Sequence, residues 1–186
     1  MNGTDKPLVF VTVGTDHHRF DRLMGWMEQW LAANGHARCV VQHGPADPPV
    51  GAECHEFLPH ADMQALFREA AVVVCQGGPG SITESRQAGS LPIVVPRIAR
   101  LDEVVDDHQV RFSRHVAAFG KVALAETAED LHAHLDRALA EPGTYTVSDA
   151  ADETAPAVAR FGRLVDELVA VPRGRRRRRD RPAESH

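Results

Sequence analysis

The sequence predicts an α/β protein with a doubly wound parallel sheet in a single Rossmann-like domain. Short apolar runs, such as residues 72–75, alternate with longer segments in which apolar residues recur at helical spacing, such as residues 20–34. Glycine follows several of the helical segments, as Gly35 and Gly89 do, and glycine is a common residue just past a helix end. The connections between apolar runs are long enough for the helical crossovers that parallel strands require. Strands and helices are therefore expected to alternate along one sheet.

The individual elements follow from the same patterns. Phe20, Leu23 and Met27 share one face of the first helical segment, and the unbroken apolar run at residues 72–75 is typical of a strand buried on both faces. We predict strands at residues 8–13, 37–42, 72–75, 92–95 and 121–124, a short further strand that ends near Phe57 and Leu58, and helices at residues 20–34, 60–70, 81–88, 106–118, 129–140 and 155–171.

Composition is that of one globular domain in a reducing compartment. The chain has 186 residues, of which 43% are apolar and 25% charged, so it can bury a core of its own. Cys39, Cys54 and Cys75 are odd in number and form no CxxC pair, which excludes a disulfide framework and a cysteine zinc site. The sequence shows neither a secretory leader nor an apolar stretch near the roughly 18 residues of a membrane span. We expect a cytoplasmic chain.

Charge divides the chain into two parts. Residues 1–171 are expected to form the domain and residues 172–186 a disordered, Arg-rich tail, because residues 173–186 carry a net charge of +5 and residues 1–172 a net charge of −10. The tail suits an anionic membrane surface, although a solvated tail with no specific partner explains it equally well. Nucleic acid is not expected as a partner, because the acidic domain would repel it and no aromatic residues are interleaved with the arginines.

Three loops follow predicted strands and should meet at the carboxyl edge of the sheet. They comprise residues 14–19, residues 76–80 and residues 97–108. In open α/β sheets, ligands bind in the crevice at this edge. The second loop holds Gly77, Gly78 and Gly80, which would let an anionic ligand approach the backbone at a helix start. The pattern indicates a nucleotide-diphosphate site, although glycines that only relieve a tight turn would look the same.

The known phosphate motifs do not fit the glycine loop. No Gly-Lys-Ser/Thr follows, so it is not a P-loop, and Thr83 stands where GxGxxG requires glycine. Ser81 and Glu84 have the spacing of a capping box at the start of a helix. Glu84 is therefore expected either to cap that helix or to accept hydrogen bonds from a ribose diol.

The third loop ends in the sequence Asp106-Asp107-His108-Gln109. Adjacent carboxylate, imidazole and amide groups offer both acceptors and donors to the hydroxyls of a sugar ring. A helix N-terminus in which the aspartates complement the macrodipole and Gln109 faces solvent explains the same residues. Both explanations remain open at this point.

These motifs together resemble a known family. VFVTVGT at residues 9–15, FDRL at 20–23, CQGGPGSITES at 75–85, AGSLPIVVP at 88–96 and DDHQ at 106–109 resemble the C-terminal, nucleotide-sugar-binding half of family 28 glycosyltransferases. The resemblance is strongest to the small catalytic subunits of bipartite transferases, such as the eukaryotic lipid-linked N-acetylglucosaminyltransferase and bacterial exopolysaccharide glucuronosyl- or glucosyltransferases, with MurG as a more distant relative. The resemblance implies that this chain has the fold of the C-terminal half of a GT-B glycosyltransferase.

The resemblance also implies a role for each matched position. Gly14 and Thr15, with the turn at residues 78–81, would face the diphosphate. Phe57 and Leu58 would lie along the uracil, Glu84 would hold the ribose, and His108 with Gln109 would hold the sugar. The implied substrate-binding residues are Gly14, Thr15, Phe57, Leu58, Gln76, Gly77, Gly78, Gly80, Ser81, Glu84, Asp107, His108 and Gln109. Gln76 departs from the family, in which many members carry histidine, and His17 or His18 is the catalytic candidate that this chain offers in its place.

The implied reaction is inverting transfer of a hexosyl group from UDP-GlcNAc, UDP-glucose or UDP-glucuronate, without a metal or other cofactor. The acceptor would be lipid-linked or a polysaccharide precursor, held by a membrane-associated partner subunit at the inner face of the membrane. A non-catalytic nucleotide-binding scaffold and a UDP-sugar epimerase or hydrolase are the alternatives. A neighbouring gene for a membrane-anchored second half would favour the transferase, and turnover of UDP-sugar without an acceptor would favour the epimerase or hydrolase.

Overall fold

The computed structural model describes residues 6–147, all of which belong to one compact unit, Met1–Ala150. The predicted helix at residues 155–171 and the predicted Arg-rich tail at 172–186 lie outside the described residues.

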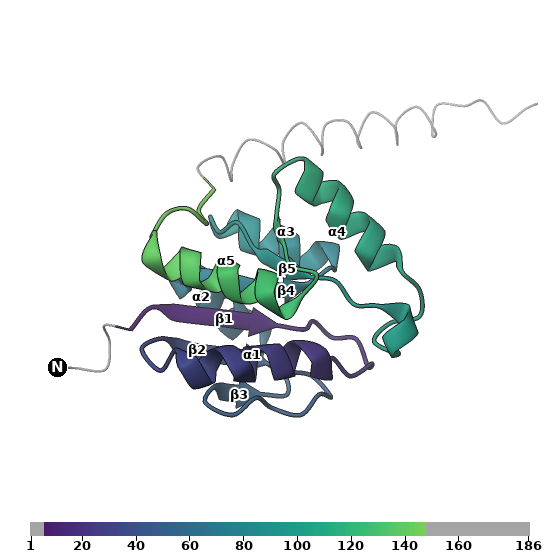
Figure 1. The fold of residues 1–186 in the computed structure, drawn as a ribbon, viewed down its shortest axis with the longest axis horizontal. Helices are drawn as coiled ribbons and strands as arrows, with labels where there is room; N and C mark the ends of the chain where they lie inside the picture. The colour runs from purple at the N-terminus through teal and green to yellow at the C-terminus, as the bar shows by residue number, and fades with distance from the viewer. Residues whose placement is uncertain (1–5, 148–186) are drawn as a thin grey trace, which may run out of the picture. The chain divides into compact units, whose positions relative to one another are not determined.

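A parallel sheet of six strands forms the centre of the described unit (Figure 1), with the strand order β3-β2-β1-β4-β5-β6. The strands are β1 (Leu8–Thr12), β2 (Arg38–Gln42), β3 (Glu53–His55), β4 (Val72–Gln76), β5 (Ile93–Val95) and β6 (Ala123–Leu124). The helices are α1 (Asp21–Ala33), α2 (His60–Glu69), α3 (Pro79–Gln87), α4 (His108–Ala118) and α5 (Ala128–Ala140), with a 3₁₀ turn η1 (Ala99–Leu101) before α4. The predicted doubly wound α/β fold is confirmed.

The order of the strands reverses between β1 and β4. β1 pairs with β2 on one side and β4 on the other, so Val11 lies opposite both Val41 and Val74. The connection after β1 leads toward β2 and the connection after β4 leads toward β5, in opposite directions across the sheet. Such a reversal leaves a crevice at the carboxyl ends of the two strands, where ligands bind in this fold class.

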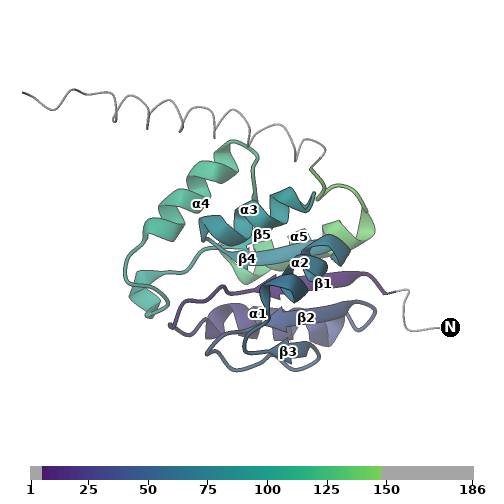
Figure 2. The ribbon, with the colours of Figure 1, turned by 180° about the vertical axis from the view of Figure 1, so that it is seen from behind.

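Helices cover both faces of the sheet. Figure 1 shows α1 and α5 over one face, and Figure 2, from behind, shows α2 and α3 over the other. Val9 and Val11 pack with Met27 of α1 and Leu135 of α5. The alternate residues of β1 point the opposite way, so Phe10 packs against Phe67 of α2, with ring centroids 5.1 Å apart. The central strands are therefore buried on both faces, as their unbroken apolar runs predicted.

Most predicted boundaries agree with the structure to within two residues, with differences where a turn intervenes. β3 ends at His55, so Phe57 and Leu58 belong to the loop after it. α4 begins at His108, two residues later than predicted, with Asp107 as its N-cap. The start of α3 differs in a way that matters for the site and is described below.

Candidate functional site

The turn after β4 is closed by a side chain from its own strand. Gln76 ends β4, and its Oε1 accepts a hydrogen bond from the backbone N–H of Gly78. A Cβ atom at Gly78 would lie 2.6 Å from that Oε1, and a Cβ atom at Gly14 would collide with the amide nitrogen of Gln76. Gly14 also has a φ of 73°, which favours glycine. Glycine at these two positions lets the Gln76 amide lie between the loop after β1 and the turn after β4.

Gly77 allows a different contact, between the turn and α4. A Cβ atom at Gly77 would lie 2.5 Å from Ser113 Oγ and 3.1 Å from Gln109 Cβ. Among residues 6–147, the buried Ser113 Oγ has no hydrogen-bond partner, and the distances show that α4 lies directly against the turn. At Gly80, in contrast, a Cβ atom would meet nothing within 4 Å. Only Gly80 of the three loop glycines has open space beside it.

The capping box predicted at Ser81 and Glu84 is wrong. α3 begins two residues earlier, at Pro79, with Gly78 as its N-cap. Proline is favoured at the first helical position because its fixed φ suits the helix and it has no N–H to satisfy. Ser81 is buried in the first turn, and Glu84 lies in the second turn, where its side chain stays 31% exposed. Glu84 therefore has no capping role.

A pocket of about 330 Å³ lies at the carboxyl ends of β1 and β4, where the strand order reverses. It is lined by Gly14, Thr15, Gln42, Phe57, Leu58, His60, Met63, Gln76, Gly80, Ser81 and Glu84. We call it the switch-point pocket. It brings together eight of the residues that the sequence assigned to substrate binding: Gly14, Thr15, Phe57, Leu58, Gln76, Gly80, Ser81 and Glu84. A second hollow of about 320 Å³ shares Gly14, Thr15, Gln42 and Phe57 with it.

Gln42 is a pocket residue that sequence reasoning missed. It ends β2 and is only 2% exposed. Its Oε1 accepts a hydrogen bond from the Thr12 hydroxyl at 2.6 Å, and its Nε2 donates to Gly14 O at 2.9 Å. The signal in the sequence was a polar residue closing an otherwise apolar buried strand. Gln42 fixes the backbone of the loop after β1 from the neighbouring strand.

The third predicted loop reaches the other two, but Asp107, His108 and Gln109 are absent from the lining of the switch-point pocket. Gln109 is 6% exposed, lies beside Gly77, and accepts a hydrogen bond from Arg97 N at 3.3 Å, so the alternative in which it faces solvent is wrong. Asp107 accepts from Ala99 N at 2.9 Å. The ring of His108 is 56% exposed and contacts Asp106, 2.5 Å from its Oδ1. The expected meeting of the three loops is confirmed by these contacts.

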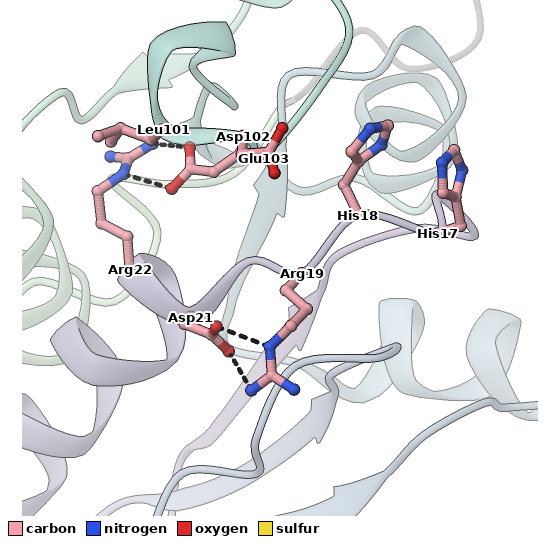
Figure 3. A pocket seen from close by; sticks show the side chains of 8 residues that line it. All are labelled: His17, His18, Arg19, Asp21, Arg22, Leu101, Asp102 and Glu103. Atoms are coloured by element: carbon pink, nitrogen blue, oxygen red, sulfur yellow. Dashed lines mark hydrogen bonds and ion pairs between the residues drawn. The ribbon is translucent and has the colours of Figure 1, made fainter.

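A larger pocket of about 570 Å³ lies beside the loop after β1 (Figure 3). It is lined by His17, His18, Arg19, Asp21, Arg22, Leu101, Asp102 and Glu103. We call it the histidine pocket. Figure 3 shows the two histidines side by side, apart from the ion pair of Arg22 and Glu103, in which two nitrogens lie 2.8 and 2.9 Å from the carboxylate oxygens. Two histidine side chains thus line one part of the pocket, and the ion pair of Arg22 and Glu103 lines another.

Arg97 is fully buried between the loop after β1 and the loop after β5. Its guanidinium donates to Val13 O at 3.1 Å, to His18 O at 2.9 Å and to Glu103 O at 2.9 Å, and it lies 4.6 Å from the centroid of the Phe20 ring. Burial lowers the pKa of Arg97, and the nearby carboxylates of Asp16 and Glu103 oppose that shift. Arginine is commonly exposed, so its type gave no signal of this role. Arg97 fixes both ends of the loop that lines the two pockets.

Metal and thiol chemistry receive little support from the described residues. The ligand atoms of Asp16, His17 and His18 lie within 4.8 Å of one another, but a direct hydrogen-bond contact between Asp16 and His18 already occupies the nearest pair, and we assign no metal ligand there. Burial raises the pKa of both Cys39 and Cys75 to about 12, so neither thiol is poised as a nucleophile. Among residues 6–147, none of the helices is both long and apolar enough to cross a membrane.

Comparison with known proteins decides the family. Residues 8–161 match the model of the glycosyltransferase family 28 C-terminal domain. The chain belongs to this family. Within the family, it is 30% identical over 106 residues to a UDP-N-acetylglucosamine--N-acetylmuramyl-(pentapeptide) pyrophosphoryl-undecaprenol N-acetylglucosamine transferase of Xylella fastidiosa strain M12, covering 56% of this chain and 27% of that protein. It is 36% identical over 69 residues to the protein of the same description from Solibacter usitatus strain Ellin6076, covering 37% of this chain and 18% of that protein.

Solved structures show the same fold. MurG of Acinetobacter baumannii matches with a TM-score of 0.53 and 22% identity, covering 76% of this family 28 domain and 44% of that chain. The glycotransferase of kitacinnamycin matches with a TM-score of 0.56 and 22% identity, covering 91% of this chain and 41% of the other. The family 28 domain therefore corresponds to the C-terminal half of a GT-B glycosyltransferase, as predicted, and spans less than half of the proteins it matches.

Proposed function

We propose that this chain is the donor-binding part of a hexosyltransferase that takes its hexosyl group from a UDP-sugar. The observation that carries the proposal is the switch-point pocket, in which eight of the substrate-binding residues implied by the family resemblance lie together at the reversal of strand order. The description of the relatives as N-acetylglucosamine transferases supports a UDP-linked hexose. UDP-GlcNAc, UDP-glucose and UDP-glucuronate are the donors to compare.

The lining of the pocket suits the separate parts of such a donor. Phe57 is 67% exposed and offers an aromatic face to the uracil. The Glu84 carboxylate is partly exposed and lies 3.9 Å from His60 Nδ1, and its oxygens can also accept hydrogen bonds from the ribose hydroxyls. Backbone N–H groups in the first turn of α3, at Gly80 and Ser81, suit the diphosphate, and Thr15 lines the same pocket. Of the third loop, the exposed His108 is the residue we assign to the sugar.

The reaction that these groups support is inverting transfer without a metal cofactor. As the bond between the sugar and UDP breaks, negative charge develops on the diphosphate, and donors fixed at a helix N-terminus stabilise that charge. The rigidity of the turn around Gln76 and Gly78 favours this role, because donors already in place need no reorganisation during the reaction.

Transfer also needs a surface that holds the acceptor. We propose that a separate, membrane-associated subunit supplies it and presents a lipid-linked or polysaccharide-precursor acceptor at the cytoplasmic face of the membrane. The family 28 domain corresponds to the C-terminal half of a GT-B enzyme, which leaves the acceptor to a second half. The basic residues between Arg173 and His186 would add attraction to an anionic membrane surface.

Isothermal titration of the full chain with UDP tests the proposal, with uridine and inorganic phosphate as controls. We expect UDP to bind more tightly than either control, since it alone engages both ends of the pocket. A chain that binds no UDP, alone or with the co-purified product of a neighbouring gene, is not a donor-binding subunit.

Deletion of residues 173–186 tests the role of the tail. It should leave UDP affinity unchanged and lower the recovery of the protein with anionic vesicles, and equal recovery would reject the membrane role of the tail.

A further inference from the structure

The outer face of α4 presents one continuous row of side chains to solvent. Gln109 and Ser113 are buried on the inner face of this helix. Residues three or four positions apart lie on the same side of a helix, so four exposed residues with this spacing form a row along the outer face. They are His108, Arg111, His115 and, directly after the last residue of the helix, Phe119. We call them the α4 row. Figure 2 shows α4 at the outer end of the helices α2, α3 and α4.

The α4 row lies in a basic part of an acidic domain. Among residues 6–147, α4 is the only α-helix without an aspartate or a glutamate. Residues 108–121 hold three basic residues and no acidic one, whereas residues 6–147 as a whole hold 12 basic and 18 acidic residues. An anionic surface is therefore attracted to α4 and repelled by most of the remaining domain.

Arg111 is the cation at the centre of the row. The neighbouring Arg114 is engaged within the domain, because its Nε donates a hydrogen bond to Glu126 Oε1 at 2.9 Å. Within residues 6–147, in contrast, the Arg111 guanidinium makes no hydrogen bond or ion pair, although its charge reaches the Asp106 carboxylate. An exposed guanidinium in this state can donate to phosphate oxygens from outside.

Exposed apolar side chains lie at both ends of the basic face. Phe119 follows the helix and is 67% exposed, and Val105 precedes the helix and is 82% exposed. The rings of Phe119 and His115 are in edge contact, with centroids 5.1 Å apart, so Phe119 continues the row. The 11 residues of α4 span about 16 Å. A protein partner would need two separate apolar pockets at this distance, whereas a lipid surface accepts isolated apolar side chains anywhere.

We propose that the α4 row docks on an anionic membrane surface, with Arg111 on lipid phosphates and Phe119 between the lipid headgroups. This contact is separate from the one proposed for residues 173–186. It places His108, at the start of the row, next to the membrane. Because His108 is the residue assigned to the donor sugar, docking would bring the sugar to the surface where a lipid-linked acceptor lies. The consequence for the donor rests on the proposed function, but docking itself does not.

Sedimentation of the full chain with vesicles tests the electrostatic part. The vesicles consist of phosphatidylcholine alone or of equal parts of phosphatidylcholine and phosphatidylglycerol, and we expect the wild-type chain to bind the anionic ones more tightly. Arg111→Glu should weaken that binding by roughly tenfold or more at low salt, and the effect should shrink as salt is added. Arg68→Glu makes the same charge change at an exposed position of α2 and should have a far smaller effect.

Replacement of Phe119 tests the insertion of its ring. Phe119→Ser should weaken binding to anionic vesicles at low and at high salt, whereas Val50→Ser, at another exposed apolar residue, should not. Phe119→Trp should keep the binding and place an indole among the lipids. Phospholipids brominated in their acyl chains should then quench fluorescence more strongly in Phe119→Trp than in Val50→Trp, since both proteins share Trp26 and Trp30 as background. Equal quenching in the two proteins would overturn the insertion.

The remaining outcomes are also decisive. Wild-type binding to anionic vesicles by both Arg111→Glu and Phe119→Ser would assign the membrane contact to other residues, such as 173–186, and overturn the proposal. Loss of co-purification with a neighbouring gene product, at unchanged vesicle binding, would assign the face to a protein partner and overturn it as well. Both variants should keep the UDP affinity and the unfolding midpoint of wild type. A chain that binds vesicles through α4 but binds no UDP fails only the proposed function.

Discussion

The side-chain oxygen of Gln76 accepts a hydrogen bond from the backbone N–H of Gly78, so the last residue of β4 closes the turn that leads into α3. One consequence is that the N–H of Gly78 is already occupied, and the free N–H groups of this helix start lie further along, at Gly80 and Ser81. Another is that the amide nitrogen of Gln76 is the donor turned toward Gly14. The turn is thus organised before any ligand arrives.

Gln76→Glu should weaken UDP binding without disturbing the turn. A glutamate can still accept from Gly78 N–H, but it places a negative charge where Gln76 presents an amide nitrogen. We expect UDP affinity to fall by roughly tenfold or more, which corresponds to about 1.4 kcal/mol, and to fall further at low salt. Calorimetry at two salt concentrations measures this. Uridine, which has no phosphate, should bind both proteins alike, and a parallel loss of uridine affinity would contradict the explanation.

Glu84→Gln should separate ligand binding from helix stability. Because α3 begins at Pro79 and Glu84 caps nothing, the change should leave the free energy of unfolding within roughly 0.5 kcal/mol of wild type. If the carboxylate accepts from the ribose diol, UDP affinity should fall by roughly 1.5 to 3 kcal/mol. Urea unfolding and calorimetry give the two numbers. With 2′-deoxy-UDP as ligand, the difference between the two proteins should shrink, and a difference that persists undiminished argues against contact with that hydroxyl.

Gly77→Ala and Gly80→Ala should have opposite effects on stability. The added methyl group at position 77 meets Ser113 Oγ and α4, so we expect a destabilisation of roughly 1 to 3 kcal/mol. At position 80 the methyl group meets no atom and raises helix propensity, for a gain of up to about 1 kcal/mol. Thermal and urea unfolding measure both. Ser113→Ala, which removes a buried hydroxyl without a partner, should recover part of the loss at Gly77; no recovery would show that the backbone of α4 is the obstacle.

Arg97→Met should be among the most destabilising substitutions in the domain. It leaves the buried carbonyl oxygens of Val13, His18 and Glu103 without their donor, and we expect a cost of at least about 3 kcal/mol. Arg100→Met, on the exposed surface of the same loop, is the matched control and should change stability by less than roughly 0.5 kcal/mol. Equal unfolding midpoints in urea for the two variants would mean that Arg97 does not hold the loops together.

The sequence predicted the parts of this protein that depend on local pattern. The unbroken apolar run of β4 and the glycines after it were enough to place a strand, a turn and a helix. The exact start of α3 could not be predicted in this way. Ser81 and Glu84 have the spacing of a capping box, but the helix begins at Pro79. A real capping box is formed by Thr127 and Asp130 at the start of α5, where no proline competes.

Contacts between distant segments were the part that local pattern could not reveal. Gln109 was expected either to bind the sugar or to face solvent, and it is buried instead, because Gly77 lets α4 approach the turn after β4. No sequence pattern indicated that Arg97 would be buried, and its carbonyl partners are known only from the folded structure. The pairing of Asp16 with His18 depends on the turn of a short loop, which residue types alone do not determine.

The position of Arg97 has a mechanical consequence. A single guanidinium joins the loop after β1 to the loop that carries Glu103, so the two loops cannot shift independently without breaking a buried hydrogen bond. Leu101 and Val105, the exposed apolar residues of the second loop, are therefore coupled to Gly14 through one side chain. A protein that docks on that loop and displaces it would therefore have to move the loop after β1 as well or break these hydrogen bonds.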